Sequence, residues 1–197
     1  LDITRNNVQR LVRLIGNILD MDDIQSGRMR LDFRPIALGR LVERALEEQR
    51  AAAAAAGVHV EWRNHAPRGL VYADGERMLQ TLNHLLSNAL KFSPRGGTLT
   101  VDLESVDGWL CVTLADQGPG IPEEFRERIF QPFAHAATDD ADVRSGAGLG
   151  LSIARAIIEQ HAGTIGYKPG RESGARFYFE LPELHNSALE STTDAPE

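Results

Sequence analysis

The sequence predicts an α/β protein: a two-layer sandwich in which three helices cover one face of a mixed sheet of about five or more strands, preceded by a long N-terminal helix. Segments with helical periodicity alternate with short apolar segments typical of strands. Two pairs of such strands, within 98–115 and 164–181, follow each other closely enough to predict antiparallel hairpins. Of the 197 residues, 42% are hydrophobic and 25% are charged. These are values of an ordinary globular protein, so the chain should fold.

The first element is an amphipathic helix over residues 1 to about 26. Its apolar residues recur at spacings of three and four, at Val8, Leu11, Ile15 and Ile18. This face needs a cover. A helix from another segment or a second chain would supply it, and the alternative is packing on the domain that follows.

The remaining elements follow in order. A short strand is expected at 28–35, a helix at 36–57 that ends at Gly57, a strand at 58–64 and a helix at 74–93. Strands at 98–106 and 109–116 come next, then a segment at 116–147 rich in Gly, Pro, Asp and Ala with a short helix at 122–130. A helix at 149–163 and strands at 164–169 and 175–182 complete the fold, and 184–197 has the polar composition of a tail or linker.

Charge and composition narrow the class of protein. The net charge is −7 and the Lys and Arg residues are scattered, so a nucleic-acid partner is not expected. The single cysteine, Cys111, forms no disulfide within the chain. No apolar run is long enough to span a bilayer and no signal peptide is evident. We therefore expect a cytoplasmic chain without direct membrane contact, whose full protein could be anchored upstream because the sequence begins inside a helix.

The helix at 74–93 carries a polar stripe opposite its apolar face. Its members are Arg77, Gln80, His84, Asn88 and Lys91. The amide oxygen of Asn88 suits Mg²⁺, and Lys91, one turn later, is a cation for phosphate. Such a stripe faces either a ligand or, as on most helices, water.

Two glycine clusters follow this helix. "GAGLGLS" (146–152) directly precedes a helix, where bare backbone N–H groups and the helix N-terminus could cradle phosphates, although such glycines also serve plain turns. "DQGPGIP" (116–122) follows a strand, so Asp116 could accept a hydrogen bond from an exocyclic amine beside Gly118 and Gly120, or be a turn aspartate. The P-loop, the dinucleotide-binding fingerprint and the protein-kinase motifs are absent from the sequence.

Together these motifs resemble a known family. "LNHLLSNALKFSP", "DQGPGIP", "IFQPF", "GAGLGLSIARAIIEQHAG" and "SGARFYFELP" resemble, in order and spacing, the N box, first glycine box, F box, second glycine box and final glycine motif of sensor histidine kinases. These kinases belong to the GHKL superfamily, whose ATPase domain has the Bergerat fold. By this resemblance, 1–27 is part of the second helix of the dimerisation hairpin, 28–183 the ATP-binding catalytic domain and 184–197 a flexible tail or linker.

The resemblance implies ATP and Mg²⁺ as cofactors and a role for each matching residue. Asn88 would bind the metal, Asp116 the adenine amino group, and Arg144 the γ-phosphate. Phe130 and Phe133 would anchor a mobile lid from about 134 to 147. The residues expected to contact nucleotide are Asn88, Lys91, Phe92, Asp116, Gly118, Gly120, Ile121, Phe133, Gly146, Gly148, Leu149, Gly150 and Leu151.

The sequence departs from the family pattern at two points. His84 stands where the family most often has Asn or, in related ATPases, Glu; it is either a neutral polar substitute, which we favour, or a catalytic base. The acceptor histidine of the family's H box is missing, so the chain alone should bind ATP without labelling itself.

The resemblance also implies partners and a reaction. The expected partners are ATP, a second copy through the N-terminal helix, and a response regulator. The reaction is histidine phosphorylation for transfer onward to an aspartate. A catalytically silent nucleotide-binding scaffold and a hydrolytic GHKL ATPase are the alternatives.

Overall fold

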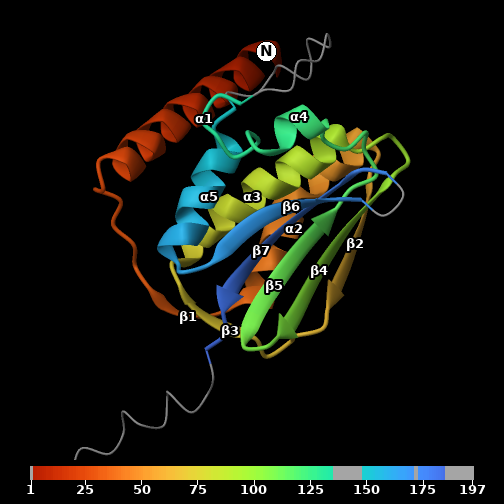
Figure 1. The fold of residues 1–197 in the computed structure, drawn as a ribbon. Helices are drawn as coiled ribbons and strands as arrows, with labels where there is room; N and C mark the ends of the chain where they lie inside the picture. The colour runs from red at the N-terminus through yellow and green to blue at the C-terminus, as the bar shows by residue number, and fades with distance from the viewer. Residues whose placement is uncertain (1, 135–147, 171–172, 185–197) are drawn as a thin grey trace, which may run out of the picture.

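The protein forms one sandwich with a helix attached (Figure 1). The structure, a computed structural model, describes residues 2–134, 148–170 and 173–184. In chain order the elements are α1 (Asp2–Gln25), β1 (Arg34–Ala37), α2 (Leu38–Ala56), β2 (His59–Asn64), β3 (Leu70–Ala73), α3 (Gly75–Phe92), β4 (Thr98–Val106), β5 (Trp109–Ala115), α4 (Glu123–Arg126), α5 (Gly150–Gln160), β6 (Thr164–Pro169) and β7 (Ala175–Pro182).

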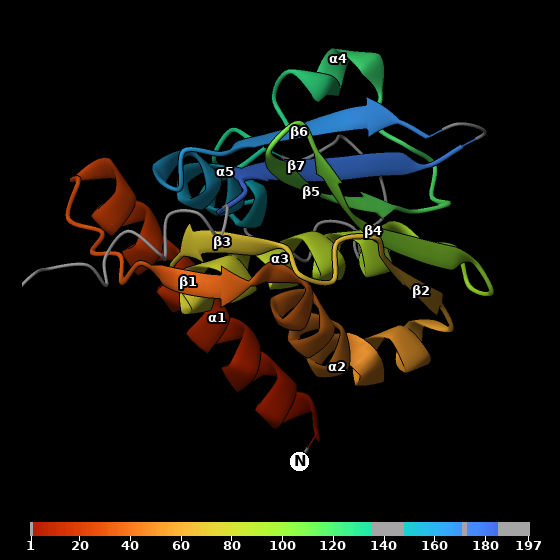
Figure 2. The ribbon, with the colours of Figure 1, turned by 90° about the horizontal axis from the view of Figure 1, so that it is seen from below.

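Five strands form the main sheet, in the order β2-β4-β5-β7-β6. The β2–β4 pair is parallel and the other pairs are antiparallel. Helices α2, α3 and α5 lie on one face, and α3 packs between the other two (Figures 1 and 2). The predicted mixed sheet, its two hairpins and the three-helix layer are confirmed.

The core lies between the sheet and the helix layer. Strands β4, β5 and β7 alternate buried apolar with less buried residues, as expected for a sheet covered on one face. The largest side chains that are fully buried include Phe179, Leu103, Leu110, Met78 and Leu82. Because α3 is buried along one side by this core, its polar stripe must face outward from the sandwich.

Local sequence fixes where the helices begin and end. Asp74 caps α3, since its Oδ1 accepts hydrogen bonds from the backbone N–H of Glu76 and Arg77, both at 3.1 Å. Gly57 ends α2 in the left-handed conformation (φ 68°). The predicted helices at 36–57 and 74–93 are therefore confirmed to within two residues at each end.

Several predicted elements differ from the structure, and the short helix expected at 122–130 spans only Glu123–Arg126. The strand expected at 28–35 begins only at Arg34, and the four residues of β3 were not predicted as a strand. These two strands pair with each other, antiparallel, outside the main sheet. The helix expected to reach Gly163 ends at Gln160, because Ala162 takes a left-handed conformation (φ 56°) that no helix continues through.

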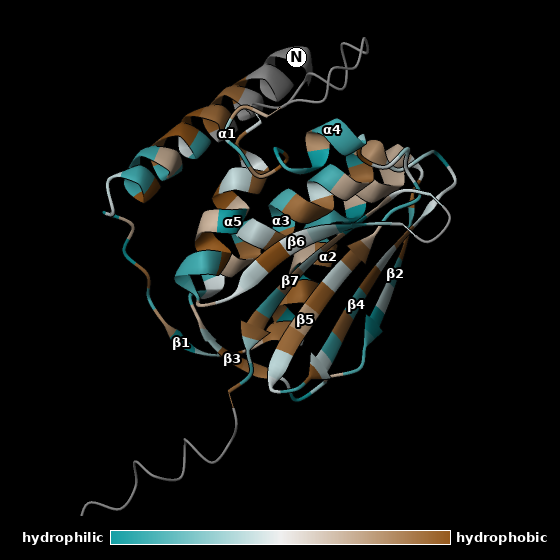
Figure 3. Cartoon of the chain, viewed as in Figure 1, coloured by the Kyte–Doolittle hydropathy of each residue, from teal (hydrophilic) through white to brown (hydrophobic). Residues whose placement is uncertain are grey.

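Helix α1 stands apart from the sandwich over much of its length (Figures 1 and 2). Figure 3 shows apolar residues recurring along it, and the described large apolar side chains from Val8 to Leu19 have exposed fractions from 37% for Leu14 to 63% for Val12. Among the side chains of α1 that the structure describes, only Met21 and Ile24, near its C-terminal end, pack on the core. The alternative considered for this face, packing on the following domain, therefore holds for this end alone, and a cover from another helix stays a prediction. No helix within the described ranges is both long and apolar enough to cross a bilayer.

Candidate nucleotide site

The first half of the polar stripe on α3 contacts helix α1, and the second half begins at His84. Near the start of the helix, Arg77 and Gln80 both donate hydrogen bonds to the carboxylate of Asp20 in α1, at 2.6 and 2.5 Å. These two residues therefore face the attached helix. Of the rest of the stripe, His84 and Asn88 are half-buried and Lys91 is exposed, with its Nζ 5.3 Å from the centre of the Phe92 ring. Only this second half is placed to meet a ligand.

His84 joins the stripe to the start of α5. A Cβ atom added to Gly150, the first residue of α5, would lie 3.0 Å from Nδ1 of His84. The His84 Nε2 is buried and has no hydrogen-bond partner in the part of the chain that the structure describes. Burial lowers the pKa of His84, and the negative charge of Asp20 offsets this only in part. The imidazole is therefore neutral at pH 7.

The start of α5 presents backbone N–H groups. The first turn of an α-helix leaves these groups without partners inside the helix, and they carry partial positive charge. Gly148, Leu149, Gly150 and Leu151 form this start, as the phosphate cradle predicted from the sequence requires. The Phe133 N–H donates to the Gly148 oxygen at 2.9 Å, which brings the two ends of the 134–147 segment together. Arg144 and Gly146, predicted to contact phosphates, lie outside the described residues.

Asp116 lies directly after β5 and is buried, with 6% of its surface exposed. Its Oδ1 accepts hydrogen bonds from the backbone N–H of Gly118 at 2.8 Å and of Ala175 at 3.0 Å. Burial raises the pKa of Asp116, and the two hydrogen bonds counteract that rise only in part. Neither bond uses Oδ2, so this oxygen can accept from a ligand amine.

Three distant segments meet around Asp116. A Cβ atom at Gly118 would lie 2.5 Å from the backbone oxygen of Phe92, at the end of α3. A Cβ atom at Gly174 would lie 2.0 Å from the backbone oxygen of Asp116, and Gly174 has a left-handed conformation (φ 84°). Only glycine fits at these two positions. Asp116, Gly118 and Phe92, all predicted for the site, are thus brought together.

The structure adds two residues that sequence reasoning missed. Gly174 and Ala175 hold the main chain and the carboxylate of Asp116 in place, although they were noted only as part of the final glycine motif. Their signal in the sequence was the Ser-Gly pair directly before a strand, which is equally typical of an ordinary turn.

The remaining predicted pocket residues differ in their packing. Gly120 lies close to Gly174, since a Cβ atom added to Gly120 would lie 3.1 Å from the backbone oxygen of Gly174. Ile121 packs against the core. Phe130 packs edge-on against Phe177, with ring centroids 6.3 Å apart. The side chain of Phe133 is 69% exposed. The described contact of Phe133 with the far side of the 134–147 segment is made by its backbone N–H, and the anchoring role of Phe130 and Phe133 stays a prediction.

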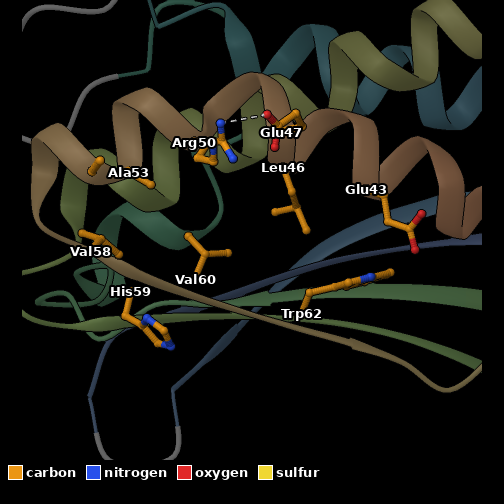
Figure 4. A pocket seen from close by; sticks show the side chains of 10 residues that line it. Glu43, Leu46, Glu47, Arg50, Ala53, Val58, His59, Val60 and Trp62 are labelled. Carbon is orange, nitrogen blue, oxygen red and sulfur yellow. Dashed lines mark ion pairs between the residues drawn. The ribbon is translucent and has the colours of Figure 1, made fainter.

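A second hollow lies elsewhere on the molecule. It is a groove of about 470 Å³ between α2 and the edge strand β2 (Figure 4). Leu46, Val60 and Trp62 contribute its apolar part, and Glu47 and Arg50 form an ion pair of 3.4 Å beside it. None of the predicted site residues lines this groove, so it is separate from the candidate nucleotide site.

A family model matches the part of the chain that contains the candidate site. The model of the histidine kinase-, DNA gyrase B- and HSP90-like ATPases matches residues 73–185. This range is more than half of the chain and contains every residue proposed for the candidate nucleotide site. The chain belongs to this ATPase family.

Similar proteins narrow the type of ATPase. The histidine protein kinase DivJ of Caulobacter vibrioides is 34% identical over 188 residues, which are 94% of this chain and 31% of DivJ. Full-length ShkA in complex with AMPPNP has a TM-score of 0.79 and 27% identity, over 91% of this chain and 37% of ShkA. The histidine kinase ThkA in complex with the response regulator TrrA has a TM-score of 0.73 and 28% identity, over 93% and 50%.

Within the family, the ATP-binding domain of this chain is of the sensor histidine kinase type. The chain itself spans only a small part of such proteins, from 12% to 33% of curated relatives such as DivJ.

Proposed function

We propose that residues 28–183 are the ATP-binding catalytic domain of a sensor histidine kinase and that α1 belongs to the second helix of its dimerisation hairpin. In the full protein, the γ-phosphoryl group of Mg-ATP passes to a histidine outside this chain and then to an aspartate of a response regulator. The observation that carries the proposal is the meeting of the end of α3, the Asp116 loop and Gly174, with the start of α5 held to α3 at His84.

Each part of ATP has a matching group in this arrangement. The free Oδ2 of Asp116 accepts from the adenine amino group, beside a main chain without side chains at Gly118 and Gly120. The backbone N–H groups of α5 bind the phosphates. In this proposal, Arg144 and Gly146 complete the contacts with the phosphates. Removal of these two residues would therefore remove two donors that stabilise the phosphate charge.

Magnesium fits a site with few protein ligands. No group of three or more His, Cys, Asp or Glu residues in the described ranges is arranged to hold a metal ion. Mg²⁺ commonly keeps several waters and binds mainly substrate phosphates, so the amide oxygen of Asn88 is a sufficient protein ligand. When bound, the ion would neutralise charge on the phosphates.

For this reaction the chain has to position ATP and does not have to supply a nucleophile. A nitrogen of the acceptor imidazole forms a bond to the γ-phosphorus while the bond from phosphorus to the bridging oxygen of ADP breaks. The acceptor histidine is itself the nucleophile, so the domain needs to align ATP and stabilise charge. His84 suits this role, because burial lowers its pKa and a lower pKa weakens it as a base. We therefore assign it the role of a polar substitute at the contact of α3 with α5.

Two alternatives remain distinct from this proposal. A nucleotide-binding scaffold would bind ATP without transferring phosphate. The missing acceptor histidine and the replacement by His84 are both consistent with such a scaffold. A hydrolytic ATPase of the same family would release phosphate without an acceptor. The proposed partners, a second copy through α1 and a response regulator, would be shared by a kinase and a scaffold but not by a hydrolase.

A phosphotransfer assay separates the three functions. The chain is joined to a first dimerisation helix that carries an acceptor histidine, then incubated with γ-labelled ATP and Mg²⁺. A kinase gives acid-labile, base-stable phosphohistidine, a scaffold gives none, and a hydrolase releases labelled phosphate without an acceptor.

The variant Asn88→Ala tests the metal assignment in the same assay. It should lower transfer at least a hundredfold, because one preorganised charge-stabilising ligand contributes about 3 kcal/mol. Its circular dichroism and melting temperature should match those of the unmodified chain, since Asn88 is only half-buried. Normal transfer by Asn88→Ala would refute the assignment.

A further inference from the structure

Helix α1 is held to the sandwich by a closed set of three hydrogen bonds. Asp20 accepts from Arg77 Nη1 at 2.6 Å and from Gln80 Nε2 at 2.5 Å, and Arg77 Nη1 also donates to Gln80 Oε1 at 3.0 Å. We call these three residues the Asp20 clasp. Each member orients the other two, so the removal of one weakens the whole set.

The clasp is more sheltered from water than the other ion pairs of this region. The side chains of Asp20 and Arg77 are 16% and 27% exposed. By contrast, Asp22, two positions after Asp20, forms an ion pair with Arg28 of the linker. Both side chains of this pair are more than 60% exposed. Exposed pairs contribute little, whereas charged hydrogen bonds shielded from water are stronger. The Asp20 clasp is thus the strong polar contact here, and the Asp22 pair is a natural control.

The clasp lies at the only end of α1 that packs on the sandwich in the described structure. Met21 and Ile24, next to Asp20, are partly buried against the core, while the apolar residues from Val8 to Leu19 whose side chains are described are exposed. Once the clasp opens, little apolar contact remains to keep α1 docked.

A hinge lies between the clasp and a second attachment point. The backbone N–H of Asp32 donates to Oδ2 of Asp74 at 2.9 Å, which ties the end of the linker to the cap of α3. Between Gln25 and Asp32 the chain contains no helix or strand, and Gly27 has a left-handed conformation (φ 66°). The backbone N–H groups of Arg28 and Met29 both donate to the Asp23 oxygen, at 2.9 and 3.2 Å, so residues 26–29 belong with the end of α1. If Asp20 releases Arg77 and Gln80, α1 can turn about residues 30 and 31 while the Asp32 end of the linker stays fixed.

We propose that the Asp20 clasp is a latch that holds α1 docked on α3 and α5, and that its opening releases the catalytic domain to move relative to the helix. Asp20, Arg77 and Gln80 are positioning residues in this view, and none of them contacts nucleotide. This inference rests on the proposed function: the latch slows phosphotransfer, because the closed position fixes the Asn88 end of α3 relative to the dimerisation hairpin.

Amide hydrogen exchange measures the latch without any need for activity. Exchange of residues 14–25 is compared in the unmodified chain, Asp20→Ala, Arg77→Ala and the double variant, at concentrations where the chain is monomeric. Each single change should speed exchange about tenfold or more, and the double variant should be no faster than either. Alanine favours helix more than aspartate does, so a loss of protection in Asp20→Ala reports docking rather than helix propensity.

Controls separate the latch from general damage and from the proposed function. Asp22→Ala should leave the exchange of 14–25 unchanged, and all variants should bind AMPPNP with unchanged affinity. Reversal of the pair, Asp20→Arg with Arg77→Asp, should restore part of the protection. Unchanged exchange in Asp20→Ala, or strictly additive effects in the double variant, would overturn the latch.

The kinetic consequence is tested in the chain joined to an acceptor helix. Asp20→Ala should raise the rate of phosphohistidine formation at saturating ATP without changing the KM for ATP. An equal or lower rate would contradict the regulatory role while the exchange result stands by itself. No phosphohistidine in any variant would instead count against the proposed function.

Discussion

The two carboxylate oxygens of Asp116 have different tasks. Oδ1 accepts two backbone hydrogen bonds from Gly118 and Ala175, which tie together segments far apart in the sequence. Oδ2 accepts neither of these bonds, and we propose that it binds the adenine amino group. The structure thus shows the structural role of the residue, whereas the sequence left a binding role and a turn aspartate as alternatives.

Two substitutions of Asp116 should separate these tasks. Asp116→Asn keeps an oxygen for the two N–H groups but turns an NH₂ group toward the adenine amine, so we expect AMPPNP to bind about ten- to a hundredfold more weakly with little change in stability. Asp116→Ala leaves two buried N–H groups without an acceptor and should also lower the free energy of unfolding by about 2 kcal/mol or more. Calorimetric titration and urea unfolding measure the two effects. Equal stability of Asn and Ala variants would show that the two hydrogen bonds contribute nothing.

The sequence could suggest which residues would meet a ligand, but not the full environment of the polar stripe on α3. Asn88, Asp116 and Gly118 were predicted because their chemistry suits Mg-ATP and their motifs are local. That Arg77 and Gln80 face Asp20 depends on how α1 docks, which is a contact between residues about 60 positions apart. No local pattern encodes such a contact.

At the scale of elements, His161 joins α5 to the start of α3. Its Nδ1 donates to the Ile157 oxygen at 2.7 Å, since a carbonyl oxygen can only accept, and its Nε2 accepts from the Asp74 N–H at 3.0 Å. Both bonds together require the neutral imidazole. Burial lowers the pKa of His161, while the Ile157 hydrogen bond and the charge of Asp74 raise it by less.

Stability should therefore depend on pH through His161. The unfolded chain binds a proton at this histidine near its ordinary pKa of 6.5, whereas the folded protein resists protonation until a lower pH. The stabilisation is thus complete above about pH 6.5 and is lost as the pH falls below it. Urea unfolding between about pH 7.5 and about pH 5.5 should show this decline.

The variant His161→Gln is the control for this prediction. It should be less stable at pH 7.5 and show a shallower decline, with part of the slope left because burial lowers the pKa of His84 as well. An identical slope in both proteins would contradict the assignment to His161.

The cap of α3 links three segments and should matter for stability. Asp74 accepts from the N–H groups of Glu76, Arg77 and Asp32. Burial by itself would raise the pKa of Asp74, but these hydrogen bonds and the charge of Arg77 outweigh it and lower the pKa. Asp74→Ala should lower the free energy of unfolding by about 1–2 kcal/mol, as measured in urea, and Asp74→Asn by less. A neutral Ala variant would contradict the capping role.

Long elements with a single clear period were predictable, and short ones were not. β4, at Thr98–Val106, and β6, at Thr164–Pro169, alternate apolar and polar residues, and their predicted bounds are confirmed. β1 and β3 have four residues each, and each gains its hydrogen bonds from the other, more than 30 residues away. A strand that short carries too little pattern to be distinguished from a loop.

At the scale of the whole molecule, we expect the sandwich to fold without α1. The fully buried core begins at Leu38, and α1 contributes only partly buried side chains to it. Residues 28–197 alone should therefore stay folded and bind AMPPNP with a Kd within about threefold of the whole chain. A loss of folding or of binding would show that α1 is integral to the domain.

The exposed apolar side of α1 should drive association. Its large side chains, from Val8 to Leu19, are more exposed than a stable monomer commonly allows for neighbouring apolar residues. Sedimentation should show concentration-dependent self-association of the whole chain and none for 28–197. A whole chain that stays monomeric at high concentration would argue against a second copy as the cover of this face.

The central claim is that the end of α3, the Asp116 loop and the start of α5 form one site for Mg-ATP. A crystal structure of the chain with Mg²⁺ and AMPPNP tests it most directly. We predict the adenine amino group on Asp116 Oδ2, the phosphates at Gly148–Leu151 and the metal on the Asn88 oxygen. A nucleotide bound elsewhere, such as in the groove between α2 and β2, with these groups left free, would contradict the claim.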